Sequence, residues 1–270
     1  MTGPSAGRSG PFAAPPTTSA PPAERFDLTG KVALVTGGSR GLGRAMSLAF
    51  AAAGADVVVA SRKLESCEEV AGLVRAMGRR ALAVSCHVGH WNELETLAGA
   101  AYDAFGRVDV LVNNAGMSLL YRELSEVTEE MWDKVVDLNM KGVFRLTTLV
   151  GERMRQAGRG SVVNVSSTGS IRPTPWIVPY AAAKAGVNAM TEAFAVALGP
   201  EVRVNCIMAG PFFTDIAKAW DMPSIEQGLQ RHALHRGGQP DEVVGAALYF
   251  ASDASSFTTG AVLRVDGGIP

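Results

Sequence analysis

The chain has 270 residues, of which 47% are hydrophobic, enough for one large core. Its formal net charge of -1 provides no long-range attraction to nucleic acid or to an anionic membrane, so a small molecule is the expected partner. The sequence contains no run of about 20 apolar residues that would span a membrane. Cys67, Cys86 and Cys206 lack the short spacing of a metal site and fit a reducing compartment, so we expect a cytoplasmic protein.

Residues 1–25 are rich in Pro, Ala, Ser and Thr and contain too little apolar bulk to pack. The segment also lacks the continuous apolar stretch of a secretion signal. We therefore expect a disordered tail over residues 1–25 and a single folded domain over residues 26–270.

From residue 31 onward, short β-branched runs alternate with longer stretches of helical spacing. The predicted strands span residues 32–37, 56–61, 81–86, 108–114, 160–167, 202–210 and 261–268. The predicted helices span residues 43–54, 64–78, 91–106, 129–158, 179–199 and 240–252. This alternation predicts an α/β fold, a doubly wound parallel sheet of about seven strands with helices on both faces. The irregular stretch 211–238 is longer than an ordinary connection, so we predict a lid there.

The first predicted strand runs into TGGSRGLG, which places Gly37, Gly41 and Gly43 between a strand and a helix. Glycine permits a tight turn and a close approach to a pyrophosphate, which the free N–H groups at a helix N-terminus stabilise. Such turns also occur without a ligand. The strand before and the helix after favour a dinucleotide site in a Rossmann-like fold.

The second predicted strand ends in Ser61 and Arg62, about 20 residues after the glycine turn, where an Asp or Glu would bind the ribose 2′-hydroxyl of NAD. A hydroxyl and a guanidinium instead suit the 2′-phosphate of NADP, and Arg40 could reach the same phosphate. The alternative is that Arg62 and Lys63 are solvated charges at a strand end. We predict NADP(H) as the cofactor, with NAD(H) less favoured.

Tyr180 and Lys184 stand four residues apart in YAAAK, within a stretch of helical spacing, and so share one helical face. A neighbouring ammonium stabilises phenolate and lowers the pKa of a tyrosine below its ordinary value of about 10. The pair could then move a proton. The alternative is an ordinary surface pair, so other segments must support the catalytic interpretation.

The motifs, taken together, resemble those of the short-chain dehydrogenase/reductase family over about residues 26–270. They stand in the family's order: TGGSRGLG at 36–43, NNAG at 113–116, Asn139 in DLNMKG, NVSS at 164–167, YAAAK at 180–184 and AGPFFT at 209–214. The terminal ASDASSFTTGAVLRVDGG is also typical of the family.

The resemblance implies that Tyr180 exchanges a proton with the substrate oxygen, while Lys184 lowers its pKa and binds the nicotinamide ribose. Ser167 would polarise the substrate carbonyl, with Ser166 structural, and Asn139 would hold a water that links Lys184 to solvent. The predicted cofactor-binding residues are Gly37, Ser39, Arg40, Gly41, Leu42, Gly43, Ser61, Arg62, His87, Val88, Asn114, Ala115, Gly116, Tyr180, Lys184, Gly210, Phe212 and Thr214. Among them, Phe212 and Thr214 match positions that hold the nicotinamide carboxamide.

Two positions depart from the family pattern. His87 stands where the family usually has an Asp beside the adenine, and Ala209 precedes Gly210 where the family has Pro. We expect adenine contacts and the nicotinamide loop to differ there. His87 and His90, and likewise His232 and His235, have a helical metal-site spacing, but no carboxylate or cysteine cluster completes either pair, so we predict no metal.

These observations predict an NADP(H)-dependent oxidoreductase that transfers a hydride between nicotinamide and a ketone or secondary alcohol. Apolar residues in and beside the lid predict an apolar substrate pocket, although some of them could instead close the core or a subunit contact: Phe212, Phe213, Ile216, Trp220, Met222, Ile225, Trp176 and Ile177. The alternative enzymes are a 3-oxoacyl thioester reductase acting on acyl carrier protein or CoA substrates, and a sugar or polyol dehydrogenase. A non-catalytic cofactor-binding regulator is the alternative outside the enzymes.

Residues 181–198 carry many small side chains, which permit close contact between helices. With the family resemblance, this predicts a homotetramer of two-fold symmetry built from the two long middle helices and the C-terminal segment. The alternative is a helix that packs only within its own chain.

Overall fold

The computed structural model describes residues 21–214 and 227–270, so residues 1–20 and the predicted lid residues Ile216, Trp220, Met222 and Ile225 lie outside the described part. Seven parallel strands form one sheet in the order β3-β2-β1-β4-β5-β6-β7. The strands are β1 Val32–Thr36, β2 Asp56–Ser61, β3 Ala81–Ser85, β4 Val110–Asn113, β5 Gly160–Ser167, β6 Val202–Ala209 and β7 Val262–Val265. The predicted doubly wound sheet is confirmed, and its strand order reverses between β1 and β4.

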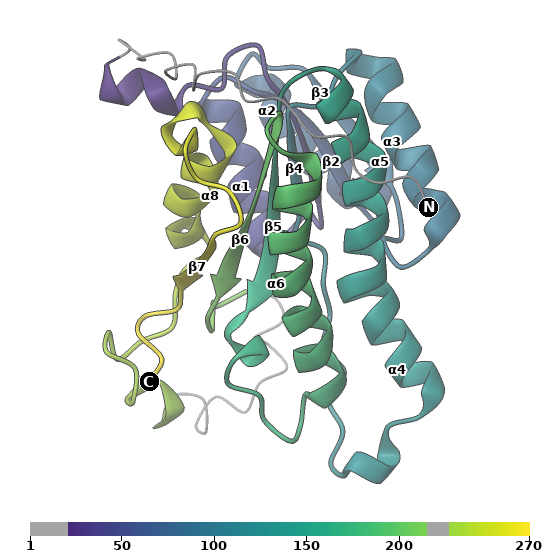
Figure 1. The fold of residues 1–270 in the computed structure, drawn as a ribbon, viewed down its shortest axis with the longest axis vertical. Helices are drawn as coiled ribbons and strands as arrows, with labels where there is room; N and C mark the ends of the chain where they lie inside the picture. Colours follow the sequence, from purple (N-terminus) through teal and green to yellow (C-terminus); the bar gives the residue numbers. More distant parts are fainter. Residues whose placement is uncertain (1–20, 215–226) are drawn as a thin grey trace, which may run out of the picture.

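Helices cover both faces of this sheet. They are α1 Gly41–Ala52, α2 Leu64–Ala76, α3 Trp91–Phe105, α4 Glu129–Val136, α5 Gly142–Gln156, α6 Val178–Leu198 and α8 Val244–Ala251. Figure 1 shows α1 and α8 on one side of the sheet and α3, α5 and α6 on the other. Within the described ranges, no helix has both the length and the apolar character needed to cross a bilayer.

Burial on both faces explains the continuous β-branched runs of the strands. In β1, Ala33 and Val35 belong to the core beneath α1, α2 and α8, whereas Val32 and Leu34 belong to the core beneath α3, α5 and α6. Successive side chains of a strand point to opposite faces, so an apolar residue is needed at successive positions, here from Val32 to Val35.

The predicted helix over residues 129–158 is two helices separated by a π-turn at Asp137–Lys141. In this π-turn the Asn139 side-chain amide donates to the Val135 carbonyl at 2.8 Å, while the Gly142 N–H donates to the Asp137 carbonyl five residues earlier. In an ordinary α-helix the Val135 carbonyl would accept a backbone N–H, whereas here it accepts the Asn139 side-chain amide. Such π-turns often mark functional sites.

Two further boundaries differ from the sequence prediction. Residues 240–243 form a short 3-10 helix before α8, because Gln239 and Glu242 form a capping box at its start. Residues 22–26, part of which we predicted as tail, also form a 3-10 helix, with a proline at its first position.

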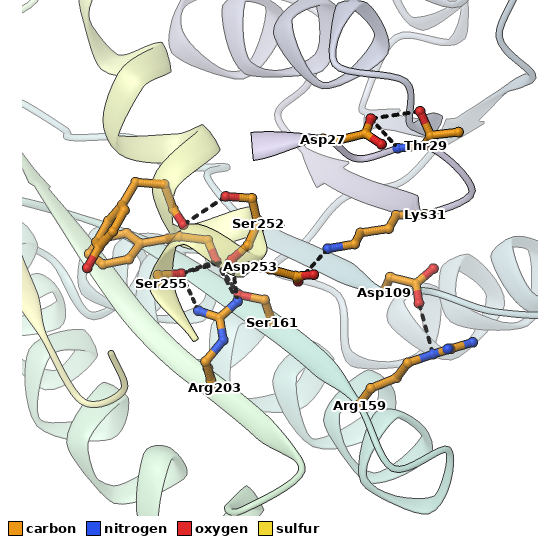
Figure 2. Close-up of polar contacts among 12 residues, drawn as sticks. Asp27, Thr29, Lys31, Asp109, Arg159, Ser161, Arg203, Ser252, Asp253 and Ser255 are labelled. Carbon is orange, nitrogen blue, oxygen red and sulfur yellow. Dashed lines mark hydrogen bonds and ion pairs between the residues drawn. The ribbon is translucent and has the colours of Figure 1, made fainter. Parts of the chain in front are cut away.

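A polar cluster joins the C-terminal part of the chain to the amino ends of β5 and β6 (Figure 2). The Arg203 guanidinium donates to the carbonyls of Phe250 and Ser252, each at 3.1 Å, and to the Ser255 hydroxyl at 2.5 Å. The Ser161 hydroxyl donates to the Phe250 carbonyl at 2.7 Å. These contacts fasten the end of α8 at the amino edge of the sheet, opposite the edge where the predicted site residues lie.

Candidate active site

The predicted site residues follow the carboxyl ends of six neighbouring strands. The glycine turn follows β1, Arg62 follows β2, His87 lies after β3, Asn114 after β4, and Gly210 after β6, while Ser167 is the last residue of β5. In open α/β sheets this edge forms the ligand-binding crevice where the strand order reverses. One edge therefore brings together segments that are far apart in the sequence.

The glycine turn is packed too closely for side chains. A Cβ added at Gly43 would overlap the Gly37 carbonyl oxygen and lie 2.6 Å from Asn114 Nδ2. Gly41 has a φ of +52°. The Asn114 side chain holds the turn by donating to the carbonyls of Thr36 at 3.0 Å and Gly37 at 3.2 Å.

Helix α1 begins directly after this turn and has no side-chain cap at its N-terminus. Its first N–H groups are therefore available to an anion, and the glycines leave space for a phosphate to approach the backbone. The residues present thus fit the pyrophosphate of a dinucleotide. Thr214 lies beside the same turn, with its Cγ2 3.2 Å from a Cβ built at Gly41.

Arg40 and Arg62 are exposed at the outer side of the crevice, and Ser61 is half-buried. Among the described residues, neither guanidinium forms an ion pair with a carboxylate. The Ser85 hydroxyl donates to the Arg62 carbonyl at 3.0 Å, which fixes the backbone after β2 against β3. Two cations without carboxylate partners fit an anionic group at this end of the site.

His87 lies beyond β3 in a cluster with His90 and Glu93. The His87 backbone N–H donates to Glu93 Oε2 at 2.6 Å, and the His87 ring stacks on the His90 ring with centroids 4.1 Å apart. Burial, together with the charges of His90 and Arg62, lowers the pKa of His87, so its ring is neutral at neutral pH. Within the described ranges, no group of three or more His, Cys, Asp or Glu side chains could hold a metal ion.

Ser167, Tyr180 and Lys184 meet at the carboxyl end of β5. Tyr180 lies beside Ser167, because a Cβ built at Gly169 would be 3.4 Å from Ser167 Oγ and 3.8 Å from Tyr180 Cε1, and Ser167 Oγ accepts the Gly169 N–H at 3.1 Å. Lys184 is buried, and its Nζ donates to the Val165 carbonyl at 2.9 Å. Ser166 is buried below them and donates to the Lys184 carbonyl at 3.1 Å.

Burial shifts the pKa values of Tyr180 and Lys184 in opposite directions. It raises the pKa of Tyr180, and the Ser167 side chain opposes this only in part. It also lowers the pKa of Lys184 to about 8. The prediction that Lys184 lowers the pKa of Tyr180 is therefore wrong for the protein alone, because burial raises this pKa and Tyr180 stays protonated at neutral pH.

Asn139 reaches this set from the π-turn. Its Nδ2 donates to the Met117 carbonyl at 2.8 Å, and its Oδ1 accepts the Met117 N–H at 3.2 Å. A Cβ added at Gly116 would lie 2.9 Å from Asn139 Oδ1 and 3.4 Å from Lys184 Nζ. Gly116 therefore allows Asn139 and Lys184 to approach each other across the NNAG segment.

Two residues of the predicted pocket are placed differently from each other. The ring of Phe212 is buried in the core and packs beside Gly238. The prediction that this side chain lines the substrate pocket is therefore wrong. Ile177 lies close to the catalytic set, since its Cδ1 is 3.0 Å from a Cβ built at Gly169. Trp176 is exposed beside it.

Several supporting residues escaped the sequence analysis. The Thr36 hydroxyl accepts the N–H groups of Asn114 and Ala115 at 3.0 and 3.2 Å. Asn113 and Asn164 are joined at 2.9 Å, and Asn164 continues to Thr191 on α6 at 2.9 Å. Thr36, Asn113 and Asn164 stand in the recognised motifs, which is a usable signal, whereas Thr191 has no signal beyond being polar in apolar surroundings.

A family model described as enoyl-(acyl carrier protein) reductase matches residues 37–270. An uncharacterized oxidoreductase of Mycobacterium tuberculosis is 40% identical over 91% of this chain and 94% of its own length. The 3-oxoacyl-[acyl-carrier-protein] reductase FabG of Thermotoga maritima is 37% identical over 90% of this chain and 98% of its own. The chain belongs to the short-chain dehydrogenase/reductase family.

Solved structures of short-chain dehydrogenase/reductases share the fold. The NADPH-dependent 3-quinuclidinone reductase from Rhodotorula rubra has a TM-score of 0.90 and 30% identity, covering 96% of this chain and 99% of its own. A 7α-hydroxysteroid dehydrogenase complexed with NADH has a TM-score of 0.87 and 32% identity, covering 91% of this chain and 96% of its own. The protein is thus an NAD(P)-dependent oxidoreductase that acts on the CH–OH group of small-molecule substrates, or on the corresponding carbonyl.

Proposed function

We propose that the protein is an NADP(H)-dependent oxidoreductase that interconverts a ketone and a secondary alcohol, with Tyr180 as the acid and base. The observation that carries this proposal is the contact of Tyr180 with Ser167 above the buried Lys184, at the same sheet edge as the glycine turn. A hydroxyl pair beside a buried ammonium can orient a carbonyl oxygen and supply its proton.

The bound nicotinamide supplies the hydride in reduction and accepts it in oxidation. In reduction, Tyr180 gives its hydroxyl proton to the substrate oxygen, and Ser167 donates a hydrogen bond to the same oxygen. The Lys184 ammonium stabilises the phenolate that forms on Tyr180. The side-chain oxygen and nitrogen of Asn139 are both bonded to backbone groups. We therefore propose that the predicted water, which links Lys184 to solvent, binds the backbone of the π-turn and not the Asn139 side chain.

The choice of NADP(H) rests on this chain's own residues. Ser61 and Arg62 at the end of β2, with Arg40 in the glycine turn, offer donors and positive charge, and no carboxylate stands at the end of that strand to bind a 2′-hydroxyl. The similar proteins differ in the cofactor that they name, since one is NADPH-dependent and another is complexed with NADH. We propose that the cofactor is bound by the residues predicted from the sequence, except that the backbone of Phe212, and not its ring, lies beside the nicotinamide.

A 3-oxoacyl thioester reductase is the second candidate, favoured by 37% identity to a protein of that name. The simple ketone remains our first choice for the substrate. Exposed apolar side chains of Leu120 and Trp176 stand near the start of α6, and they suit an apolar substrate more than a sugar. The lid that we predicted over residues 211–238 lies in part outside the described residues.

We further propose that the protein assembles as a homotetramer in the cytoplasm. Phe257 is 103% exposed and Val196 on α6 is 83% exposed, so these apolar groups suit a subunit contact. The three cysteines are free and buried, which is in keeping with a reducing compartment.

The test of the proposed chemistry is Tyr180→Phe, assayed for NADPH oxidation across a panel of ketones. The ring remains and the hydroxyl is lost, so we expect turnover to fall about 100-fold or more while NADPH affinity is kept. Tyr249→Phe is the matched control, because it removes a hydroxyl bonded to Thr258 on the far side of the sheet. Near-normal turnover of Tyr180→Phe with any ketone that the wild type reduces would refute the mechanism.

A further inference from the structure

The segment from Met117 to Tyr121 connects two parts of the candidate active site. At one end, both backbone groups of Met117 are bonded to the Asn139 side chain, at 3.2 and 2.8 Å. At the other end, the Tyr121 hydroxyl accepts the Val178 N–H at 2.8 Å. The π-turn and the start of α6 are therefore joined through a single short stretch of chain.

The start of α6 depends on this hydroxyl because the helix has no side-chain cap of its own. Ile177 stands at the N-cap position without a side-chain hydrogen bond, and Pro179 has no N–H to be bonded. An uncapped helix leaves its first N–H groups without partners, and Tyr121 supplies the missing acceptor to Val178. The Tyr121 side chain is only 8% exposed, so packing holds its hydroxyl in place.

Tyr180 lies two residues after Val178, in the turn that Tyr121 holds. Its hydroxyl must meet Ser167, which belongs to β5, so the direction of the first turn of α6 decides whether the two side chains meet. A misplacement of about 1 Å can lower the rate of an enzymatic reaction by as much as 100-fold. We propose that Tyr121 is a positioning residue, which holds the first turn of α6 so that Tyr180 presents its hydroxyl to Ser167 and the substrate.

This inference rests on the proposed function, and Tyr121→Phe tests it because the change removes the acceptor and keeps the buried ring. We expect kcat for ketone reduction to fall about tenfold, with the affinity for NADPH unchanged and KM for the ketone changed less than about twofold. Amide hydrogen exchange at residues 178–182 should become faster in the same variant. Tyr249→Phe, which loses a hydroxyl contact to Thr258, should keep kcat and the exchange rates of α6.

The two readouts separate the possible failures. If wild type and Tyr249→Phe turn over ketones and Tyr121→Phe does so equally well, the positioning role is wrong, even where its thermal stability has fallen. If no variant turns over any ketone, the proposed function fails, and unchanged exchange at residues 178–182 in Tyr121→Phe would overturn the present inference as well. Faster exchange together with a loss confined to kcat supports it.

Discussion

Lys184 and Tyr180 share one face of α6, with Lys184 Nζ 5.8 Å from the centroid of the Tyr180 ring. The ammonium donates to the Val165 carbonyl and so lies beneath the ring. Burial favours the neutral form of both groups, because it raises the pKa of the tyrosine and lowers that of the lysine to about 8. At neutral pH the protein therefore holds a protonated phenol above a charged ammonium, which is the state needed to reduce a carbonyl.

Carbonyl reduction should depend on pH through Lys184. The lysine is charged below its pKa of about 8 and neutral above it, so its support for the forming phenolate is lost as the pH rises. We expect kcat/KM for the ketone to be level below this pH and to fall above it. The measurement is a pH–rate profile at saturating NADPH. Lys184→Met should be slower throughout and lack this alkaline limb, and a wild-type rate that is level well above pH 8 would contradict the assignment.

Cofactor choice should depend on Arg62. A charge-assisted hydrogen bond contributes about 1.5–3 kcal/mol, so Arg62→Ala should weaken NADPH about tenfold or more and leave NADH affinity unchanged. Fluorescence titration with both cofactors measures the effect. Lys63→Ala removes the neighbouring exposed cation and is the control, expected to change neither affinity by more than about twofold. Equal affinity of the wild type for NADH and NADPH would contradict the predicted preference.

The glycine turn should not tolerate a methyl group. In Gly43→Ala the new Cβ would overlap the Gly37 carbonyl oxygen and lie 2.6 Å from Asn114 Nδ2, which forces α1 away from the turn. We expect a loss of about 1–3 kcal/mol in the free energy of unfolding and much weaker NADPH binding, measured by urea titration and fluorescence. Gly72→Ala is the matched control, because nothing lies within 4 Å of its added Cβ in α2. Unaltered cofactor binding by Gly43→Ala would show that the turn does not contact the dinucleotide.

Assembly should depend on the exposed apolar residues near the C-terminus. Light scattering at micromolar concentration should give the mass of a tetramer for the wild type. Phe257→Glu places a charge on a side chain that is 103% exposed in the single chain, so it should disrupt assembly without unfolding the subunit. Circular dichroism provides the control for folding. A wild-type protein with the mass of a monomer would contradict the proposed tetramer.

The sheet and the glycine turn could be predicted because their signals are local. Each strand is buried on both faces and is therefore a continuous apolar run, and the turn needs glycine at fixed places. The π-turn at Asp137–Lys141 could not be predicted in this way, since it depends on Asn139 bonding to Met117, 22 residues away. Helical spacing continues through this point of the sequence and gives no sign of the interruption.

The same limit applies to the residues that hold the catalytic set. The ring of Phe212 looks like a pocket residue in the sequence, but the structure places it in the core on the face of the sheet that α1, α2 and α8 cover. Tyr121 and Val178 are 57 residues apart and belong to no motif, so only the folded chain brings the hydroxyl to the helix. Side-chain chemistry identifies which groups can react, whereas long-range packing decides which of them meet.

The polar cluster around Arg203 lies at the amino edge of the sheet (Figure 2). The residues predicted to bind cofactor and substrate follow the carboxyl ends of the strands. Substitutions at one edge are therefore separated from the other by the length of the strands. Changes in the loops at the carboxyl edge should therefore alter the choice of substrate without disturbing the polar contacts at the amino edge that stabilise the fold. Directed evolution of a new specificity should for the same reason leave Arg203 and Ser161 unchanged.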